Sequence, residues 1–188
     1  MMTYLSDYRR HVSDAMAKVD LGKVGTAVEW LRKARDAERN VYVCGNGGSA
    51  STASHFVADM GKGASYNRPT RFRIMALTDS LPTITAYAND VGYDCVFAEQ
   101  LRNFARPEDI VIALSGSGNS PNVVSAVECG NQSGCRTIAL TGRDGGKLGR
   151  LAQLNIQVGV QHMGLIEDCH LVICHMIAYW FMESKEEK

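Results

Sequence analysis

Residues 41–50, VYVCGNGGSA, join a short apolar run to a turn of glycine, asparagine and serine. The run at 41–44 has the composition of a buried strand, and a helical pattern continues after the turn. Glycine lets the backbone approach a bound group closely, and the helix that follows presents free N–H groups to an anion. The segment therefore predicts a strand, an anion-binding loop and a helix in succession.

Short apolar runs alternate with longer helical stretches along the rest of the chain. Four runs follow the first one, at residues 73–77, 110–114, 137–140 and 156–158. Strands that alternate with helices pair in parallel, with helices on both faces of the sheet, so we expect an α/β fold: a three-layer, doubly wound parallel sheet of about five strands. Several runs end in Gly, Ser, Thr or Asp, and such loops at the carboxyl ends of the strands form the ligand crevice.

Both ends of the chain carry helical patterns outside this alternation. Apolar residues recur at steps of three and four over residues 5–19 and 24–34, which predicts a pair of helices within residues 1–38. Residues 165–182 are almost uniformly apolar and predict a long C-terminal helix that is covered on most sides. These helices offer more apolar surface than one small sheet requires. We therefore expect residues 1–188 to form one domain that associates into a dimer or tetramer, with the N-terminal helix pair in the contact.

Composition limits the classes of partner. The chain has 20 Lys and Arg against 20 Asp and Glu, so no net charge attracts nucleic acid or an anionic membrane surface. No uninterrupted apolar run approaches about 18 residues, and no basic and apolar leader opens the chain. The cysteines are scattered without a C-x-x-C pair, as is typical of buried thiols in a reducing compartment. We expect a cytoplasmic protein that binds neither nucleic acid nor membrane.

Two loops of the same character point to the kind of ligand. The first spans residues 45–49, and the second, residues 115–120, reads SGSGNS. Each follows a strand and precedes a helix, so backbone N–H groups, hydroxyls and a helix N-terminus can converge on a phosphate. Either loop alone could be an ordinary turn in which serine caps the helix, but two in one short chain favour a binding role.

A dinucleotide site is the alternative, because residues 45–50 also fit G-x-G-x-x-A. Such a site requires an acidic residue about 20 positions further on, and the nearest candidate, Asp79, lies well beyond that distance. A dinucleotide also leaves residues 115–120 without a role. A small phosphorylated ligand uses both loops and is the interpretation that we favour.

Acidic and histidine side chains gather on two of the predicted helices. His55 and Asp59 stand four positions apart after the first loop, a spacing that puts both on one helix face and within reach of one metal ion. The C-terminal helix carries polar groups in apolar surroundings, where each costs free energy unless it is paired or coordinated: Glu167, Asp168, His170 and His175. Any single histidine among them could be a buried residue with a satisfied hydrogen bond.

Spacing alone leaves open which groups of the C-terminal helix act together. Asp168 and His175 lie seven positions apart, nearly on one line of a helix. Glu167 and His175 diverge by about 80° and rise by roughly 12 Å. A metal shared by Glu167 and His175 would therefore need Glu167 at a flexible start of the helix.

The chain as a whole resembles the sugar-isomerase (SIS) domain family, specifically its phosphoheptose isomerase branch, from the N-terminal helices to Met182. The resemblance is carried by residues 44–50 with His55, 88–93, 115–123 and 140–146, and by Glu167, His170 and His175 on the last helix. It implies a flavodoxin-like fold. It also implies an aldose–ketose isomerase that converts sedoheptulose 7-phosphate to D-glycero-D-manno-heptose 7-phosphate through an enediolate, for surface-polysaccharide heptose.

The resemblance also implies roles for particular residues. The metal positions are His55, Asp59, Glu167 and His175, which would hold one zinc ion per subunit, and Asp59 and His175 are in addition the catalytic positions. Family members form homotetramers with their sites at subunit interfaces. The positions that contact the phosphorylated sugar are Asn46, Gly47, Gly48, Ser49, Asn89, Asp90, Ser115, Gly116, Ser117, Ser120 and Glu167.

Several positions depart from the pattern of the best-known members. Asp59 stands where they have Glu, Glu167 where they have Gln, and Gly116 where they have Thr. Aspartate is one methylene shorter than glutamate, and a displacement of about 1 Å can change a rate on the order of a hundredfold. Two carboxylates with two histidines suit a divalent ion, so zinc is expected, with manganese or iron as alternatives. Gly164 and Leu165 replace an aspartate and an arginine of the family, which leaves the exact sugar open.

Two other functions are compatible with the sequence. Replication-initiator-associating proteins of bacteria share the fold and its loops but act as tetrameric adaptors, and a different isomerase would act on another sugar phosphate. Because an adaptor does not need ionisable groups at these positions, His55 together with His175 favours an enzyme. A residue that binds a metal is less available as a base, so Asp59 and His175 cannot simply be given both roles.

Overall fold

The computed structural model describes residues 1–184 of the 188-residue chain. Its centre is a 5-stranded parallel sheet in the order β2-β1-β3-β4-β5. The predicted α/β fold is confirmed, and each predicted strand agrees with an observed one to within two residues at either end. The strands are β1 (Asn40–Gly45), β2 (Arg73–Ala76), β3 (Ile110–Ser115), β4 (Arg136–Gly142) and β5 (Leu154–Val158).

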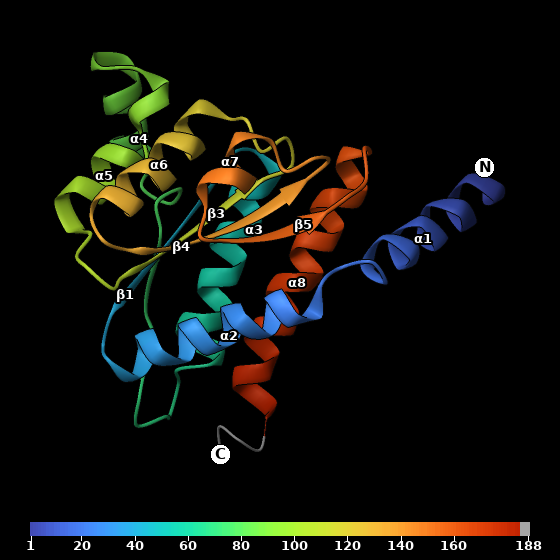
Figure 1. Ribbon diagram of the computed structural model, residues 1–188, viewed down its shortest axis with the longest axis horizontal. Helices are drawn as coiled ribbons and strands as arrows, with labels where there is room; N and C mark the ends of the chain where they lie inside the picture. The colour runs from blue at the N-terminus through green and yellow to red at the C-terminus, as the bar shows by residue number, and fades with distance from the viewer. Residues whose placement is uncertain (185–188) are drawn as a thin grey trace.

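Helices cover both faces of the sheet and so make three layers (Figure 1). Successive side chains of a strand point to opposite faces of the sheet. Val43, for example, packs in one apolar core and its neighbour Cys44 in the other. The first face is covered by α2 (Leu21–Asp36), α3 (Gly48–Ala58) and α8 (Met163–Glu183). The second face is covered by α5 (Ala98–Phe104), α6 (Pro121–Gln132) and α7 (Gly146–Leu151).

The strand order reverses direction at β1. β2 follows β1 along the chain and pairs with one of its edges, whereas β3 pairs with the other edge. At such a switch point the loops that leave the two strands diverge and open a crevice at the carboxyl end of the sheet. The loops here are residues 46–47 after β1 and residues 116–120 after β3. The topology therefore brings the two predicted binding loops side by side.

α8 is an apolar helix that runs through the core. By length and composition alone it could cross a membrane. Ile166, Ile173 and Phe181, however, are fully buried in the same apolar cluster as strand and α2 residues. The core position explains its apolar composition, and the helix predicted over residues 165–182 is confirmed.

The N-terminal helix pair is present as predicted, but its two members pack differently. α1 (Met2–Met16) extends from the body of the molecule (Figure 1), and of its apolar stripe Ala15 is buried whereas Leu5 is exposed. The hydroxyl of Tyr8 donates a hydrogen bond to Asp168 Oδ2 of α8 at 2.7 Å. α1 is thus tied to α8 by a polar contact and presents part of its apolar surface to solvent.

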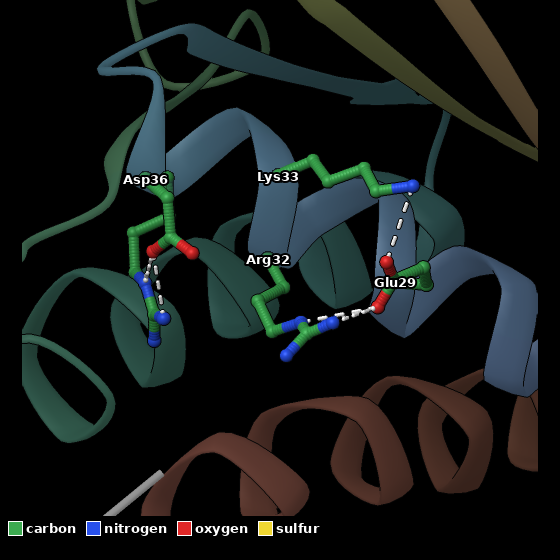
Figure 2. A network of polar contacts seen from close by, with 5 residues as sticks. Glu29, Arg32, Lys33 and Asp36 are labelled. Atoms are coloured by element: carbon green, nitrogen blue, oxygen red, sulfur yellow. Dashed lines mark hydrogen bonds and ion pairs between the residues drawn. The ribbon is translucent and has the colours of Figure 1, made fainter.

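α2 is fixed by contacts on two sides. On its half-exposed side Glu29 forms ion pairs with Arg32 and Lys33 at 2.6 and 3.2 Å (Figure 2). Hydrogen bonds from Arg32 and then Lys33 lower the pKa of Glu29, but pairs this exposed add little to stability. On the inner side the Arg35 guanidinium lies 5.4 Å from the ring centre of Phe181, which ties α2 to the end of α8.

Candidate functional site

The crevice at the switch point is a cavity of about 240 Å³ between the two loops and the start of α8. Every predicted substrate-binding residue except Asn89 and Asp90 lines it. Leu114 and Met163, which the sequence does not single out, add an apolar wall. The lining residues are Asn46, Gly47, Gly48, Ser49, Leu114, Ser115, Gly116, Ser117, Ser120, Met163 and Glu167.

Two helices begin at this cavity, each from an N-cap residue that makes no side-chain capping hydrogen bond within residues 1–184. α3 follows Gly47, which has a φ of 54°, and α6 follows Ser120. Both helix starts therefore turn a positive dipole end to an anion, and α3 adds backbone N–H groups, whereas α6 begins at Pro121, which has none. Ser120 therefore does not fit the alternative in which the serine of the loop only caps the helix.

The serine hydroxyls of the second loop converge. Ser115 Oγ lies 3.4 Å from Ser117 Oγ and 3.3 Å from Ser120 Oγ. The backbone N–H of Gly118 donates to Ser115 Oγ at 3.2 Å. Hydroxyl protons rotate freely, so these groups can turn from one another to an incoming anion. The loop thus presents a compact set of donors for a group of the size of phosphate.

The loop after β4 holds the serine loop in shape. Gly118 has a φ of 65°, and a side chain there would overlap the carbonyl group of Gly145. The carbonyl of Gly118 accepts a hydrogen bond from the N–H of Leu148 at 2.9 Å. Asn119 Oδ1 accepts another from the N–H of Lys147 at 3.0 Å. These contacts fix the serine loop before a ligand arrives, which reduces the entropy lost on binding.

Glu167 reaches the crevice from α8. Its carboxylate lies against Gly48, where an added Cβ would come within 2.7 Å of Oε1. Gly48 therefore leaves room for the carboxylate at the start of α3, where the helix dipole favours a negative charge. The same charge repels a second anion from this side of the crevice. A phosphate is accordingly better placed on the serine loop.

About two helical turns along α3 and α8 from this point, His55, Asp59 and His175 form a compact group. The Nε2 atoms of the histidines lie 3.4 Å apart. Asp59 Oδ2 lies 3.5 Å from His55 Nε2 and 3.6 Å from His175 Nε2. Asp59 opens the π-helical turn η1 (Asp59–Gly63), a type of distortion that is frequent at functional sites. The side chains of His55 and Asp59 point to the same side of the helix, as their spacing of four residues predicts.

The group fits a divalent metal ion. Asp59 Oδ2 is buried and has no hydrogen-bond partner among the residues described. A tetrahedral zinc ion binds N and O ligands at about 2.0–2.2 Å, which puts those ligand atoms about 3.4 Å from one another. The three atoms have this separation, and the His55 side chain is 49% exposed, so one side of the group is open. Three ligands and an open position are characteristic of catalytic zinc sites.

Glu167 does not belong to this group within one copy of the chain. It lies eight positions before His175, about 12 Å along the helix axis. α8 already begins at Met163, so Glu167 lies in regular helix and not in a flexible start. The four predicted metal residues therefore divide between two places: His55, Asp59 and His175 at the group, and Glu167 at the crevice.

The remaining polar residues of α8 have structural partners. Asp168 accepts the hydrogen bond from Tyr8, which raises the pKa of Tyr8 to about 12. His170 is buried, and its Nε2 lies 3.1 Å from the carbonyl oxygen of Thr141. Burial lowers the pKa of His170 to about 4, so this side chain is neutral near pH 7. His175 is thus the histidine of α8 that joins His55.

Asn89 and Asp90 are exposed at the end of α4 (Leu81–Asp90), where the Asn89 amide donates to Asp90 Oδ1 at 2.7 Å. Beyond them, the Tyr93 hydroxyl in the 3₁₀ turn η2 (Tyr93–Cys95) donates to Asn46 Oδ1 at 3.0 Å. Asn122 of α6 contacts Asn46 as well. Tyr93 and Asn122 both lie in segments that carry the family resemblance, but the sequence assigns neither a role at the site, and asparagine at a helix start is a common turn residue.

Comparison with known proteins identifies the family. Residues 3–142 match the family model of the SIS domain. The phosphoheptose isomerase of Akkermansia muciniphila is 39% identical over 141 residues, which cover 75% of this chain and 74% of that protein. The phosphoheptose isomerase of Syntrophotalea carbinolica is 34% identical over 176 residues, 94% of this chain and 89% of that protein.

Solved structures agree with this result. The phosphoheptose isomerase of Neisseria gonorrhoeae superimposes with a TM-score of 0.87 at 30% identity, covering 96% of this chain and 95% of that one. The phosphoheptose isomerase of Francisella tularensis gives a TM-score of 0.90 at 27% identity, covering 97% and 98%. The match to the SIS-domain model and these relatives show that the chain belongs to the SIS-domain family of phosphoheptose isomerases.

Proposed function

We propose that the chain is an aldose–ketose isomerase that converts sedoheptulose 7-phosphate to D-glycero-D-manno-heptose 7-phosphate, which supplies heptose for surface polysaccharides. Relatives named phosphoheptose isomerase support this reaction. The observation that carries it is that the crevice and the His55–Asp59–His175 group lie along the same two helices, α3 and α8. An isomerase of sugar phosphates needs both an anion site and a group that moves protons.

The phosphate is proposed to bind the serine loop. Ser115, Ser117 and Ser120 supply hydroxyls, and the start of α6 supplies its positive dipole end. The backbone of Gly116 lies between the first two serines. Glu167, whose charge disfavours phosphate beside α3, is suited instead to accept hydrogen bonds from sugar hydroxyls. The ligand is thereby oriented with its anionic end at β3.

Asp59 is the proposed carrier of the proton. A base removes a proton from C1 of the open-chain ketose and an enediolate forms. The proton of the O1 hydroxyl passes to O2, and a proton returns to C2. Asp59 Oδ2 faces the two histidine nitrogens, so Oδ1 is the oxygen left for the substrate. His175 Nε2 belongs to the same group. While this nitrogen binds a metal it cannot accept a proton, so His175 is not the base in the metal-bound enzyme.

We propose one zinc ion per subunit, held by His55, Asp59 and His175. Two imidazoles with a carboxylate are a donor set that zinc favours, and manganese and iron are the alternatives that metal analysis would distinguish. When bound, zinc polarises the substrate carbonyl and stabilises the negative charge that develops on the sugar. Asp59 Oδ2 is buried and has no hydrogen-bond partner within residues 1–184, which supports a cation at this position.

A cytoplasmic homotetramer is the proposed assembly, with residues 1–188 of each copy as one domain. Exposed apolar side chains on α1 and α8 support association; they include Tyr4, Leu5, Val172, Met176 and Tyr179. Because Glu167 lies about 12 Å from His175 along α8, we propose that the Glu167 of a second copy faces the open position of the group. It would be the fourth ligand until the substrate carbonyl takes that place, and would then be free to bind sugar hydroxyls.

Mixed oligomers test the shared site. His175→Ala and Glu167→Ala variants, each inactive alone, should regain activity when they are unfolded and refolded together, because some sites then combine two intact halves. Mixtures that stay inactive although the subunits have exchanged would place both residues in the same copy's site.

Isomerisation in deuterium oxide tests the proton transfer. A base that exchanges its proton with solvent leaves deuterium at C2 of the aldose, which NMR detects directly. Product without deuterium would contradict a carrier that exchanges its proton with solvent and would remove this support for Asp59. The adaptor alternative, in contrast, predicts no aldose at all and gives the His55–Asp59–His175 group no role.

A further inference from the structure

We infer that Asn122 is a positioning residue: it holds the carboxamide of Asn46 so that an N–H donor of Asn46 faces the crevice. Asn46 follows β1, and Asn122 is the second residue of α6, so their contact joins the two loops of the switch point. The inference rests on the proposed function, since the donor that Asn122 orients is one that would bind the sugar phosphate.

The two side chains form a reciprocal pair of hydrogen bonds. Asn46 Nδ2 donates to Asn122 Oδ1 at 2.8 Å, and Asn122 Nδ2 donates to Asn46 Oδ1 at 2.8 Å. Two parallel bonds fix both the separation of the amides and the plane in which they lie. Asn122 is 1% exposed, so water competes little for these bonds, and an unpaired amide there would be costly.

A backbone group decides which way the pair is oriented. The N–H of Val123 donates to Asn122 Oδ1 at 3.0 Å, and a backbone N–H can only donate. Asn122 must therefore present its oxygen to Val123 and to Asn46 Nδ2, and its nitrogen to Asn46 Oδ1. The Tyr93 hydroxyl adds a second hydrogen bond to Asn46 Oδ1 at 3.0 Å.

The consequence falls on Asn46, which lines the crevice. Its oxygen has two lone pairs, and Asn122 and Tyr93 use both. One N–H of Nδ2 remains, so the side chain meets the ligand as a donor and not as an acceptor. A donor suits phosphate and hydroxyl oxygens, and it matters here because Glu167 already brings negative charge to the crevice.

Asn122→Asp is the informative variant because it keeps the size and the bond from Val123. It loses the donor to Asn46 Oδ1 and sets two acceptors against each other, so the Asn46 amide turns. With sedoheptulose 7-phosphate we expect KM to rise about tenfold, roughly the value of one hydrogen bond, and kcat to change less. Asn131→Asp is the matched control: it lies on the same helix, where its amide donates to the carbonyl of Leu151 at 3.0 Å.

A double-variant cycle distinguishes positioning from general destabilisation. If Asn122 acts through Asn46, then Asn122→Asp raises KM in the wild type but has almost no further effect in an Asn46→Ala background. Equal and additive effects in both backgrounds, or a KM for Asn131→Asp that rises as much, would mean that Asn122 only supports the fold, and would overturn the inference.

NMR of the free protein tests, without any substrate, whether Asn122 orients the Asn46 amide. The side-chain amide signals of Asn46 should shift in Asn122→Asp and stay in place in Asn131→Asp. Unchanged Asn46 signals in Asn122→Asp overturn the inference whether or not the protein turns over the sugar. Absence of turnover by the wild type, with the expected amide shifts, would instead refute the proposed reaction and still support the positioning of Asn46 by Asn122.

Discussion

The Nε2 atoms of His55 and His175 lie 3.4 Å apart, although 120 residues separate the two histidines in the chain. The rings meet edge to face, with an interplanar angle of 72°. With Asp59 Oδ2 at a similar distance from both, the arrangement suits a shared cation or proton. α3 and α8 pack on the same face of the sheet, so the fold itself brings these side chains together.

Removal of one histidine should abolish tight metal binding. We expect His175→Ala to lower the affinity for zinc by more than about 100-fold, because loss of even an outer hydrogen-bond partner costs about 10–100-fold. Calorimetric titration of metal-free protein measures this change. His11→Ala, on an exposed face of α1, is the control that keeps the wild-type affinity. Equal affinities for zinc in His175→Ala and wild type would show that the ion binds elsewhere.

His170 should make the fold less stable in mild acid. Burial lowers its pKa from the ordinary 6.5 to about 4, so between these values the unfolded chain binds a proton that the native state does not. The free energy of unfolding therefore falls as the pH drops from about 6.5 to about 4, by up to about 3 kcal/mol. Urea unfolding at several pH values measures the slope.

His170→Gln isolates this contribution. Glutamine can still donate to the Thr141 carbonyl but does not titrate. Its unfolding free energy should depend less on pH over this range than that of the wild type. Parallel curves for the two proteins would show that His170 takes up a proton as readily in the native state as in the unfolded chain.

The conformation of the serine loop should depend on Gly118. A φ of 65° and the nearby carbonyl of Gly145 leave no room for a methyl group. We expect Gly118→Ala to cost about 1–3 kcal/mol of stability and to raise KM for the sugar phosphate, since the loop must shift. Gly159→Ala, where an added Cβ meets nothing within 4 Å, is the control. Thermal unfolding and steady-state kinetics give both values, and matching results for the two variants would contradict this account of the loop.

The parts of the site that follow from strand order were predictable. Apolar runs reveal the strands, and a glycine and serine loop after β1 and another after β3 must meet once the sheet is parallel. Helical spacing likewise placed His55 beside Asp59 and showed that Glu167 stands about 12 Å from His175.

The contacts that could not be predicted from the sequence depend on how separate elements pack. Asp168 and His175 lie on one line of α8, yet His175 faces α3 and Asp168 faces Tyr8 of α1. The rotation of α8 is set by buried residues such as Ile166 and Ile173, whose fit against the sheet no local pattern encodes. Asn122 was given no role in the site for the same reason, because that role arises from a contact with Asn46, 76 positions away.

The central claim is that the His55–Asp59–His175 group performs the isomerisation. Zinc-loaded protein is incubated with sedoheptulose 7-phosphate, and the aldose product is followed by NMR for the wild type, Asp59→Asn and His175→Ala. We expect turnover by the wild type and a loss of at least about 100-fold in each variant, the usual contribution of a positioned base. Absence of aldose with the wild type, or wild-type rates in Asp59→Asn, would contradict it.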